Sequence, residues 1–232
     1  MTEQERIREA YARRAATGAD ERYALDDPAN RYLFERRARD VQRLLRQHRL
    51  WPLAGREILD VGCGNGGVLR EFVSWGADAS RCAGVDLLVE RVEAARAAAP
   101  EMRIQQGDAS ALPWPDGSVD IALQFTLLSS VLDDGMRRAI AAETLRVLRP
   151  GGAIIVYDFT WNPTNRDVRG VGADGLRALY SGCAIDARRV TLAPPITRAL
   201  VRFSTRACAL LESVPLLRSH VLACVVKARA AS

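Results

Sequence analysis

Apolar positions along the chain follow two different spacings. Between residues 31 and 50 they recur every three or four positions, from Leu33 and Phe34 to Leu44 and Leu45, which predicts an amphipathic helix. From residue 57 onward, short apolar runs alternate with helical stretches of about 10 to 15 residues. This alternation predicts parallel βαβ units and an α/β fold.

The same pattern gives approximate bounds for each element and a division of the chain. We expect a helical extension over residues 1–52 and a main domain over residues 53–232. Residues 149–152 (Arg-Pro-Gly-Gly) are expected to form a helix stop and a turn, and a loop is expected after Asn162. Strands are predicted at 57–61, 82–87, 102–106, 119–125, 153–159, 189–192 and 220–227, and helices at 67–75, 89–99, 135–148 and 194–214.

Composition narrows the class of protein. The 232 residues are 48% hydrophobic and 26% charged, which is ordinary for a globular chain. Neither a signal-peptide core nor an apolar run of about 20 residues is visible, so we expect a cytoplasmic protein without a transmembrane segment. Five widely spaced cysteines and two histidines predict free thiols and no metal site.

Lysine is nearly absent. Of the 33 basic residues only Lys227 is a lysine. A Schiff base, a P-loop lysine or a Tyr-x-x-x-Lys pair could therefore use only this residue near the C-terminus.

A glycine-rich turn lies between the first predicted strand and the next helix. Gly62, Gly64 and Gly67 match G-x-G-x-x-G by spacing, so a nicotinamide dinucleotide has to be considered as the ligand. Asp86, at the end of the second strand, is placed to accept hydrogen bonds from a ribose in either case.

Three details separate the alternatives. The carboxylate of Asp60, two residues before the first glycine, would repel a pyrophosphate and attract a cation. Asp108, after the third strand, can accept a hydrogen bond from an exocyclic amine. No tyrosine is followed by lysine four residues later, so the catalytic pair of short-chain dehydrogenases is missing. S-adenosylmethionine carries an ammonium, ribose hydroxyls and an adenine amine, so it is the ligand that suits all three carboxylates.

Four motifs follow one another in register along the chain. They are Ile58-Leu59-Asp60-Val61-Gly62-Cys63-Gly64-Asn65-Gly66, Gly84-Val85-Asp86-Leu87, Gly107-Asp108-Ala109 with Leu112-Pro113 and Asp116 to Asp120, and Arg146 to Gly152. Together they resemble the motifs of class I S-adenosylmethionine-dependent methyltransferases. The resemblance is close over about residues 56 to 160, and the C-terminal half is similar to a bacterial type-11-like subgroup that acts on small molecules.

The resemblance implies a fold and a set of binding residues. The fold would be a Rossmann-like, doubly wound α/β sheet of seven strands in the order 3-2-1-4-5-7-6, with the seventh strand antiparallel and an N-terminal helical lid. S-adenosylmethionine would be the cofactor and S-adenosylhomocysteine the product. The methionine part would face Asp60, Gly62, Cys63, Gly64, Asn65 and Gly66, the ribose Asp86 and Leu87, the adenine Asp108 and Ala109, and the sulfonium Gln124 and Phe125. Cys63 is interpreted as packing rather than as a nucleophile.

The acceptor side is less explicit. The fourth strand lacks the Asn-Pro-Pro-Tyr type of motif, which argues against an adenine N6 target. After the fifth strand, Asp158 is the first candidate for a base or an acceptor-orienting group and Tyr157 the second. His220 is a weaker candidate. Tyr23 and Tyr32 belong to the segment that often forms a lid in related enzymes.

Charge is distributed unevenly. Residues 1–50 carry 12 basic and 9 acidic groups (+3), residues 51–160 carry 10 and 15 (−5), and residues 161–232 carry 11 and 4 (+7). In the predicted helix over 194–214, Arg198, Arg202 and Arg206 form one stripe and the apolar side chains, from Ile196 to Val214, form the opposite, packed stripe. The arginine stripe is either a solvated face or a contact for an anionic acceptor or a membrane surface.

We therefore expect a bacterial enzyme that methylates a small molecule, such as a natural product or a sugar. A hydroxyl is the first choice of acceptor and a nitrogen the second, and an anionic acceptor fits the charge. An RNA methyltransferase and a non-catalytic cofactor-binding module are the rivals, and 6% aromatic residues without an added RNA-binding domain give the former little support. No nucleic-acid partner is expected, and the alternatives of a homodimer and of a peripheral membrane contact stay open.

Overall fold

The computed structural model describes residues 1–17, 26–162 and 165–229. Its seven-stranded sheet has the order β3-β2-β1-β4-β5-β7-β6, which confirms the predicted order. The strand β7 runs antiparallel to both of its neighbours, and the other pairs are parallel. The strands are β1 (Ile58–Val61), β2 (Cys82–Asp86), β3 (Arg103–Gln106), β4 (Val119–Phe125), β5 (Leu148–Phe159), β6 (Ala184–Leu192) and β7 (Arg218–Val226).

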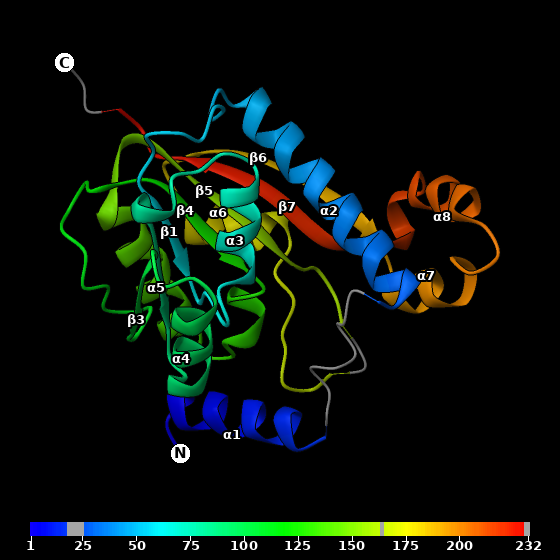
Figure 1. Ribbon diagram of the computed structural model, residues 1–232, viewed down its shortest axis with the longest axis horizontal. Helices are drawn as coiled ribbons and strands as arrows, with labels where there is room; N and C mark the ends of the chain where they lie inside the picture. The colour runs from blue at the N-terminus through cyan, green and yellow to red at the C-terminus, as the bar shows by residue number, and fades with distance from the viewer. Residues whose placement is uncertain (18–25, 163–164, 230–232) are drawn as a thin grey trace.

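Helices cover both faces of this sheet (Figure 1). The helices α2, α3 and α4 contribute to the hydrophobic core on one face, and α5 and α6 to the core on the other. The helices are α1 (Glu3–Ala16), α2 (Pro28–Gln47), α3 (Gly67–Ser74), α4 (Val89–Ala98), α5 (Asp134–Val147), α6 (Ala173–Leu179), α7 (Pro194–Leu200) and α8 (Thr205–Glu212), with short 3₁₀ turns at Ala79–Arg81, Leu128–Ser130 and Pro215–Leu217.

Alternation along the strands decides which side chain faces which layer of helices. In β4, Leu123 and Phe125 belong to the core that α2 and α3 cover, and Ala122 belongs to the opposite core. In β5, Ile155 and Tyr157 face the first layer in the same way. Since neighbouring side chains of a strand point to opposite faces, the residue next to each of these lies on the side of α5 and α6.

Two predicted loop segments are ordered elements. The residues expected to form a turn before the fifth strand are part of β5, because Gly151 N donates to the carbonyl of Lys227 (3.1 Å) and Lys227 N donates to the carbonyl of Gly152 (2.9 Å). Gly151 makes this possible with a φ of 79°. The loop expected after Asn162 contains α6, which buries Leu176 and Tyr180 under the sheet.

The single helix predicted over 194–214 is wrong. The structure has α7 and α8, separated at Ser204, whose extended backbone (φ −162°) ends the helical path and whose hydroxyl accepts from Ala207 N at 3.1 Å. The break changes which side chains are buried. Phe203 and Leu210, expected in the packed stripe, are 86% and 71% exposed.

The helix α2 is integrated into the main core. Asp27 caps its first turn by accepting from Ala29 N (2.7 Å) and Asn30 N (3.2 Å). Leu44 and Leu45, in its last turns, are fully buried with the side chains of β1 and β4. The domain boundary at residue 52 stays a prediction.

Replacement of Leu44 tests whether α2 unfolds with the sheet. We expect Leu44→Ala to lower the free energy of unfolding by about 2–5 kcal/mol, because a fully buried leucine leaves a cavity. The matched control Leu210→Ala removes the same atoms from an exposed site and should change it by less than about 0.5 kcal/mol. Urea unfolding followed by circular dichroism measures both. Equal effects of the two variants would contradict the packing of α2.

Candidate functional site

The glycine turn after β1 is joined directly to the end of β2. Gly62 N and Cys63 N both donate to the carbonyl of Val85, at 2.8 and 3.0 Å, and Gly64 N donates to Oδ2 of Asp86 at 2.8 Å. Gly62 has a φ of 77°, and a Cβ there would lie 2.8 Å from Leu127 Cδ1. Glycine is therefore required by both the conformation and the space.

Cys63 in this turn has a packing role. Its side chain is buried, and a Cβ on Gly84 of β2 would lie 2.8 Å from its sulfur. Burial raises the pKa of the Cys63 thiol, and the charges of Asp60 and Asp86 act in the same direction. The thiolate that a nucleophile needs is disfavoured here.

Asp60 is a buried carboxylate with an unsatisfied oxygen. The residue is 1% exposed, and its Oδ1 has no hydrogen-bond partner in the described part of the chain. Burial, and then the charge of Asp86, raise the pKa of Asp60 to about 8, against the opposing charge of Arg37. Buried polar atoms are normally paired, so this oxygen is suited to a ligand that donates a hydrogen bond or carries positive charge.

Two further carboxylates follow the ends of β2 and β3. Asp86 accepts from Leu88 N at 3.0 Å through Oδ1, whereas Gly64 N donates to its Oδ2. Asp108 accepts from Ser110 N at 2.8 Å and, through its other oxygen, from Nε2 of Gln4 at 2.7 Å. Gln4 lies in the first turns of α1, so this helix contacts the site directly.

Two adjoining cavities lie at this edge of the sheet. The larger has a volume of about 1720 Å³ and the smaller about 90 Å³, and they share Tyr11, Gly62 and Phe125 in their linings. The larger is lined by Asp60, Gly62, Cys63, Gly64, Asn65 and Phe125, and the smaller by Asp86, Leu87, Asp108 and Ala109. Since one drug-sized ligand occupies about 300–1,000 Å³, the larger has room for two small molecules.

Two predicted cofactor-binding residues do not line either cavity. Gly66 is the N-cap of α3, with a φ of 73°. Gln124 is fully buried on the other face of the sheet, where its Nε2 donates to Thr144 Oγ1 (2.9 Å) and its Oε1 accepts from Tyr180 (2.6 Å). Its side chain therefore points away from the cavity that its neighbour Phe125 lines.

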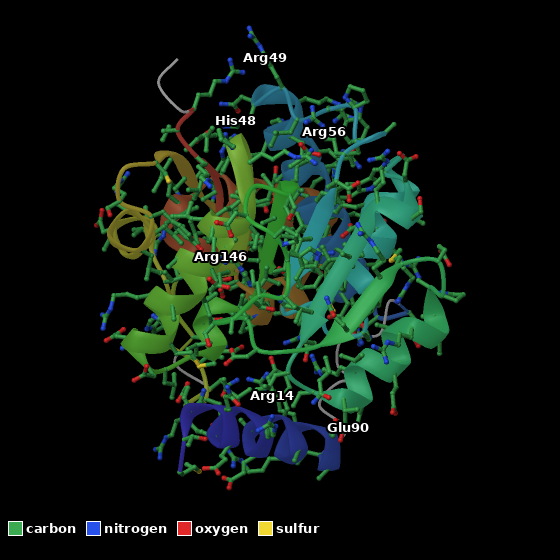
Figure 2. The ribbon with its side chains drawn as sticks, turned by 90° about the vertical axis from the view of Figure 1, so that its left-hand side faces the viewer. Arg14, His48, Arg49, Arg56, Glu90 and Arg146 are labelled. Carbon is green, nitrogen blue, oxygen red and sulfur yellow. The ribbon has the colours of Figure 1, made fainter. Side chains whose placement is uncertain are left out.

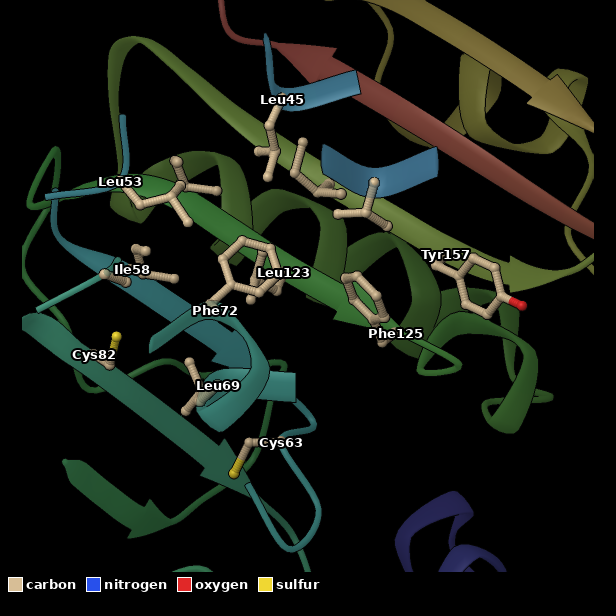
Figure 3. Packing of buried hydrophobic residues seen from close by; sticks show 14 of the residues in the cluster. Leu45, Leu53, Ile58, Cys63, Leu69, Phe72, Cys82, Leu123, Phe125 and Tyr157 are labelled. Atoms are coloured by element: carbon tan, nitrogen blue, oxygen red, sulfur yellow. The ribbon is translucent and has the colours of Figure 1, made fainter. Parts of the chain in front are cut away.

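Tyr157 and Asp158 have different surroundings although they are neighbours. Tyr157 lines the large cavity beside Phe125, with ring centroids 5.7 Å apart (Figure 3). Its hydroxyl is 2.9 Å from Oγ1 of Thr191, and burial raises the pKa of Tyr157 to about 12. Asp158 is fully buried on the opposite face and does not line either cavity.

The Asp158 carboxylate holds backbone groups. Its oxygens accept from Ser129 N (3.0 Å) and Phe159 N (2.8 Å), and burial raises its pKa to about 6 against these hydrogen bonds. His220 is also buried, with its ring 4.7 Å from that of Tyr157, and burial lowers its pKa to about 3. At neutral pH this imidazole is uncharged.

Arg37 is a site residue that sequence reasoning missed. Its Nη2 is 2.5 Å from Oε2 of Glu71, and its guanidinium carbon lies 4.6, 5.6 and 5.9 Å from the ring centroids of Phe34, Phe125 and Tyr157. Its Nε has no hydrogen-bond partner among the described residues. The available signal was its position, since residue 37 follows Phe34 by three and so lies within the apolar stripe of α2.

The helix α1 covers the site from the other side. Arg6 donates to the carbonyl of Ser130 at 2.6 Å, and Tyr11 lines both cavities with the Arg91 guanidinium 4.3 Å from its ring centroid. Figure 2 shows α1, with Arg14, at the end of the molecule opposite His48, Arg49 and Arg56. Tyr32 instead packs in a cluster with α7 and α8, and Tyr23 lies outside the described residues. The role of a lid stays a prediction.

The part of the chain that contains the glycine turn is similar to known proteins. Residues 58–152 match a family model described as a methyltransferase domain. A "probable S-adenosylmethionine-dependent methyltransferase" of Mycolicibacterium smegmatis is 36% identical over 130 residues, which are 54% of this chain and 44% of that protein. The O-methyltransferase cnsE of Penicillium expansum is 34% identical over 116 residues, 47% of this chain and 40% of that protein.

Solved structures show the same fold. A crystal structure of an S-adenosylmethionine-dependent methyltransferase from Thermotoga maritima superimposes with a TM-score of 0.63 at 18% identity, covering 94% of this chain and 99% of that one. The matched segments span less than half the length of each of these two sequence relatives.

The raised pKa of Asp60 predicts a pH-dependent stability of the ligand-free protein. The pKa of Asp60 is about 8 in the folded state and 3.8 for an ordinary aspartate, so the folded state holds this proton more tightly and loses stability as pH rises between those values. Asp60→Asn removes this dependence. We expect the wild type to lose stability relative to the variant as pH rises through this window, in urea unfolding at several pH values. A difference that does not change with pH would contradict the buried, unpaired carboxylate.

Proposed function

We propose that the protein transfers a methyl group from S-adenosylmethionine to the hydroxyl of a small, planar acceptor that is acidic or anionic. Residues 58–152 match a methyltransferase domain, and a probable S-adenosylmethionine-dependent methyltransferase is 36% identical over 130 residues. The observation that carries the proposal is the unsatisfied, buried Oδ1 of Asp60 in a cavity bordered by the glycine turn. The pyrophosphate of a nicotinamide dinucleotide would bring no donor hydrogen to this unsatisfied oxygen, and its negative charge would raise the pKa of Asp60 further. A ligand ammonium would satisfy this oxygen.

Three carboxylates at this edge of the sheet support the choice of cofactor. Asp60 and the turn would hold the amino-acid part, Asp86 the ribose, and Asp108 with Ala109 the adenine. Each carboxylate oxygen has two acceptor sites, so Asp86 can bind ribose hydroxyls while it retains Gly64 N and Leu88 N. When bound, the cofactor supplies an activated methyl group.

The rest of the large cavity supports the choice of acceptor. Phe34, Phe125 and Tyr157 offer aromatic surface, and Arg8, Arg31 and Arg37 add guanidinium groups to the lining. Aromatic rings and a guanidinium are suited to a flat molecule with negative charge. A cation next to an acceptor hydroxyl lowers the pKa of that hydroxyl, whereas it would disfavour a protonated amine.

Catalysis would then depend mainly on positioning. Methyl transfer needs the acceptor oxygen in line with the methyl group, and the ring stack and Arg37 would fix that orientation. Arg37 would also lower the pKa of the acceptor hydroxyl, so that its proton is lost to water before the oxygen attacks the methyl group, which lowers the demand on a general base. Tyr157 would orient the acceptor through its ring. The assignment of Asp158 as a base stays a prediction, and its contacts with Ser129 N and Phe159 N favour a positioning role.

Removal of the Asp86 carboxylate should weaken cofactor binding. We expect Asp86→Ala to weaken the binding of S-adenosylhomocysteine by about 1–3 kcal/mol, measured by calorimetry, because the hydrogen bonds to one group are lost. Asp174→Ala, at an exposed carboxylate on α6, is the matched control and should bind normally. Thermal unfolding without ligand checks that the turn survives. Unchanged affinity of Asp86→Ala would refute the ribose assignment.

A second prediction concerns Arg37 and the acceptor. A panel of small aromatic alcohols, amines and carbon acids is screened for release of S-adenosylhomocysteine, and the best substrate is kept. Arg37→Gln should lower kcat/KM for it by about 1.5–3 kcal/mol, roughly tenfold to a hundredfold, as expected for a hydrogen bond to a charged group. Its affinity for S-adenosylhomocysteine should stay the same.

Two outcomes would count against this assignment. Weaker S-adenosylhomocysteine binding by Arg37→Gln, with acceptor kinetics unchanged, would place the guanidinium at the cofactor instead. A best substrate that is an amine would exclude the hydroxyl. Glu71→Gln serves as the control for the ion pair, because it removes the partner carboxylate and keeps the guanidinium.

A further inference from the structure

The helices α7 and α8 and the 3₁₀ turn that follows, residues 194–217, form what we call the α7–α8 tip. Figure 1 places α7 and α8 beyond the N-terminal end of α2, on the far side of the molecule from β3. The tip exposes large apolar side chains: Phe203 is 86% exposed, Leu210 71%, Val214 42% and Leu216 85%. Of the seven large hydrophobic residues that are exposed in the described part of the chain, four lie here.

The outer surface of the tip is positively charged. Arg198, Arg202 and Arg206 are all exposed, and no ion pair of theirs is found within the described ranges. Hydrogen bonds from the backbone N–H groups of Ala29 and Asn30 are the larger cause of the lowered pKa of Asp27, to which Arg202 and Arg198 also contribute. The only carboxylate between residues 193 and 217 is Glu212. It is 4% exposed and lies 2.6 Å from Arg36, so it does not reach the outer surface.

The inner side of the tip packs against α2 and β6. Val201 and Cys208 are buried with Tyr32 of α2 and Leu192 of β6 in a separate small core. The ion pair between Arg36 and Glu212 links α2 to α8. The inner side chains are therefore committed to packing, while Phe203, Leu210 and the arginines are left on the outside.

We propose that the α7–α8 tip docks on the surface of an anionic lipid bilayer. Guanidinium groups would contact lipid phosphates, and the phenyl and leucyl side chains would enter the boundary between headgroups and acyl chains, which is the arrangement found in interfacial segments. The apolar side chains favour this partner over a nucleic acid, because Leu210 and Leu216 have no π-face on which a base could stack. The three arginines make no ion pair within the described ranges that would account for them as a salt-bridged face.

The docked tip would bring the cavity close to the lipid. The helix α2 connects the two, since Tyr32 packs under the tip and Phe34 and Arg37 line the large cavity. Within the described segments no helix has the length and apolar content needed to cross a bilayer, so the contact would be peripheral. The proposal does not depend on methyl transfer, because it concerns a surface outside both cavities.

Co-sedimentation with vesicles tests the proposal on the full chain. The expected result is binding to vesicles of phosphatidylcholine mixed with phosphatidylglycerol, and little binding to phosphatidylcholine alone. Arg198→Gln, Arg202→Gln and Arg206→Gln combined should reduce the partition coefficient by about a hundredfold, since each arginine near an anionic surface contributes about fivefold. Phe203→Ser, Leu210→Ser and Leu216→Ser combined should reduce it as well, including at high salt.

A charge-matched control separates the tip from net charge. Arg43→Gln, Arg49→Gln and Arg138→Gln combined remove three exposed arginines elsewhere, and this variant should bind as the wild type does. All variants are checked for an unchanged thermal midpoint, which exposed positions should preserve. An equal loss in the control variant, or no binding to the anionic vesicles, would overturn the proposal.

Two other partners are outcomes of the same series. If a labelled RNA or DNA oligonucleotide bound more tightly than the vesicles, and binding depended on the arginines but not on the apolar side chains, the surface would be one for nucleic acid. If the serine variant converted a dimer to a monomer in analytical ultracentrifugation while vesicles were not bound, the surface would be a contact between two copies. Either result would refute membrane docking.

Discussion

The turn after β1 and the end of β2 share a set of hydrogen bonds on which the whole site depends. The carbonyl of Val85 accepts from two successive amides of the turn, and the Asp86 carboxylate accepts from a third. These bonds require the left-handed conformation of Gly62 and bring the turn close enough to β2 to leave no room for a Cβ at Gly84. They place Asp60 and Asp86 on neighbouring strands, where the charge of Asp86 adds to burial in raising the pKa of Asp60. In this arrangement Oδ1 of Asp60 has no hydrogen-bond partner among the described residues and can accept a hydrogen bond from a ligand.

Much of the fold could be predicted because the chain alternates cleanly between two periodicities. The strand β4 was predicted at its observed bounds, and the order of the sheet followed from the resemblance. The errors lie where local chemistry competes with periodicity. Ser204 caps a new helix within an apolar pattern that would otherwise continue, so Phe203 and Leu210 turn outward. Single-chain periodicity cannot detect a break of this kind.

Site residues at or just after the end of a strand could be predicted from the sequence. Within a strand the prediction was less accurate, because there the side chain reaches the cavity only if it points to the correct face of the sheet. Asp60 and Asp108 line the cavities because they end strands or follow them. Gln124 and Asp158 are each one residue away from a cavity-lining aromatic and therefore point to the opposite layer. Counting in steps of two from the apolar residues would have shown this. Arg37 comes from a distant helix, and its place beside Tyr157 depends on tertiary packing.

The contact between Gln4 and Asp108 has a thermodynamic consequence. The amide of Gln4 donates to Oδ2 of Asp108, and the same helix α1 is attached to the loop after β4 through Arg6. This oxygen has two acceptor sites, so a ligand amine that takes the site used by Gln4 competes with that amide, whereas an amine that takes the other site does not. For a competing ligand, binding and the docking of α1 are negatively coupled, and the measured affinity includes the free energy of the lost Gln4 contact.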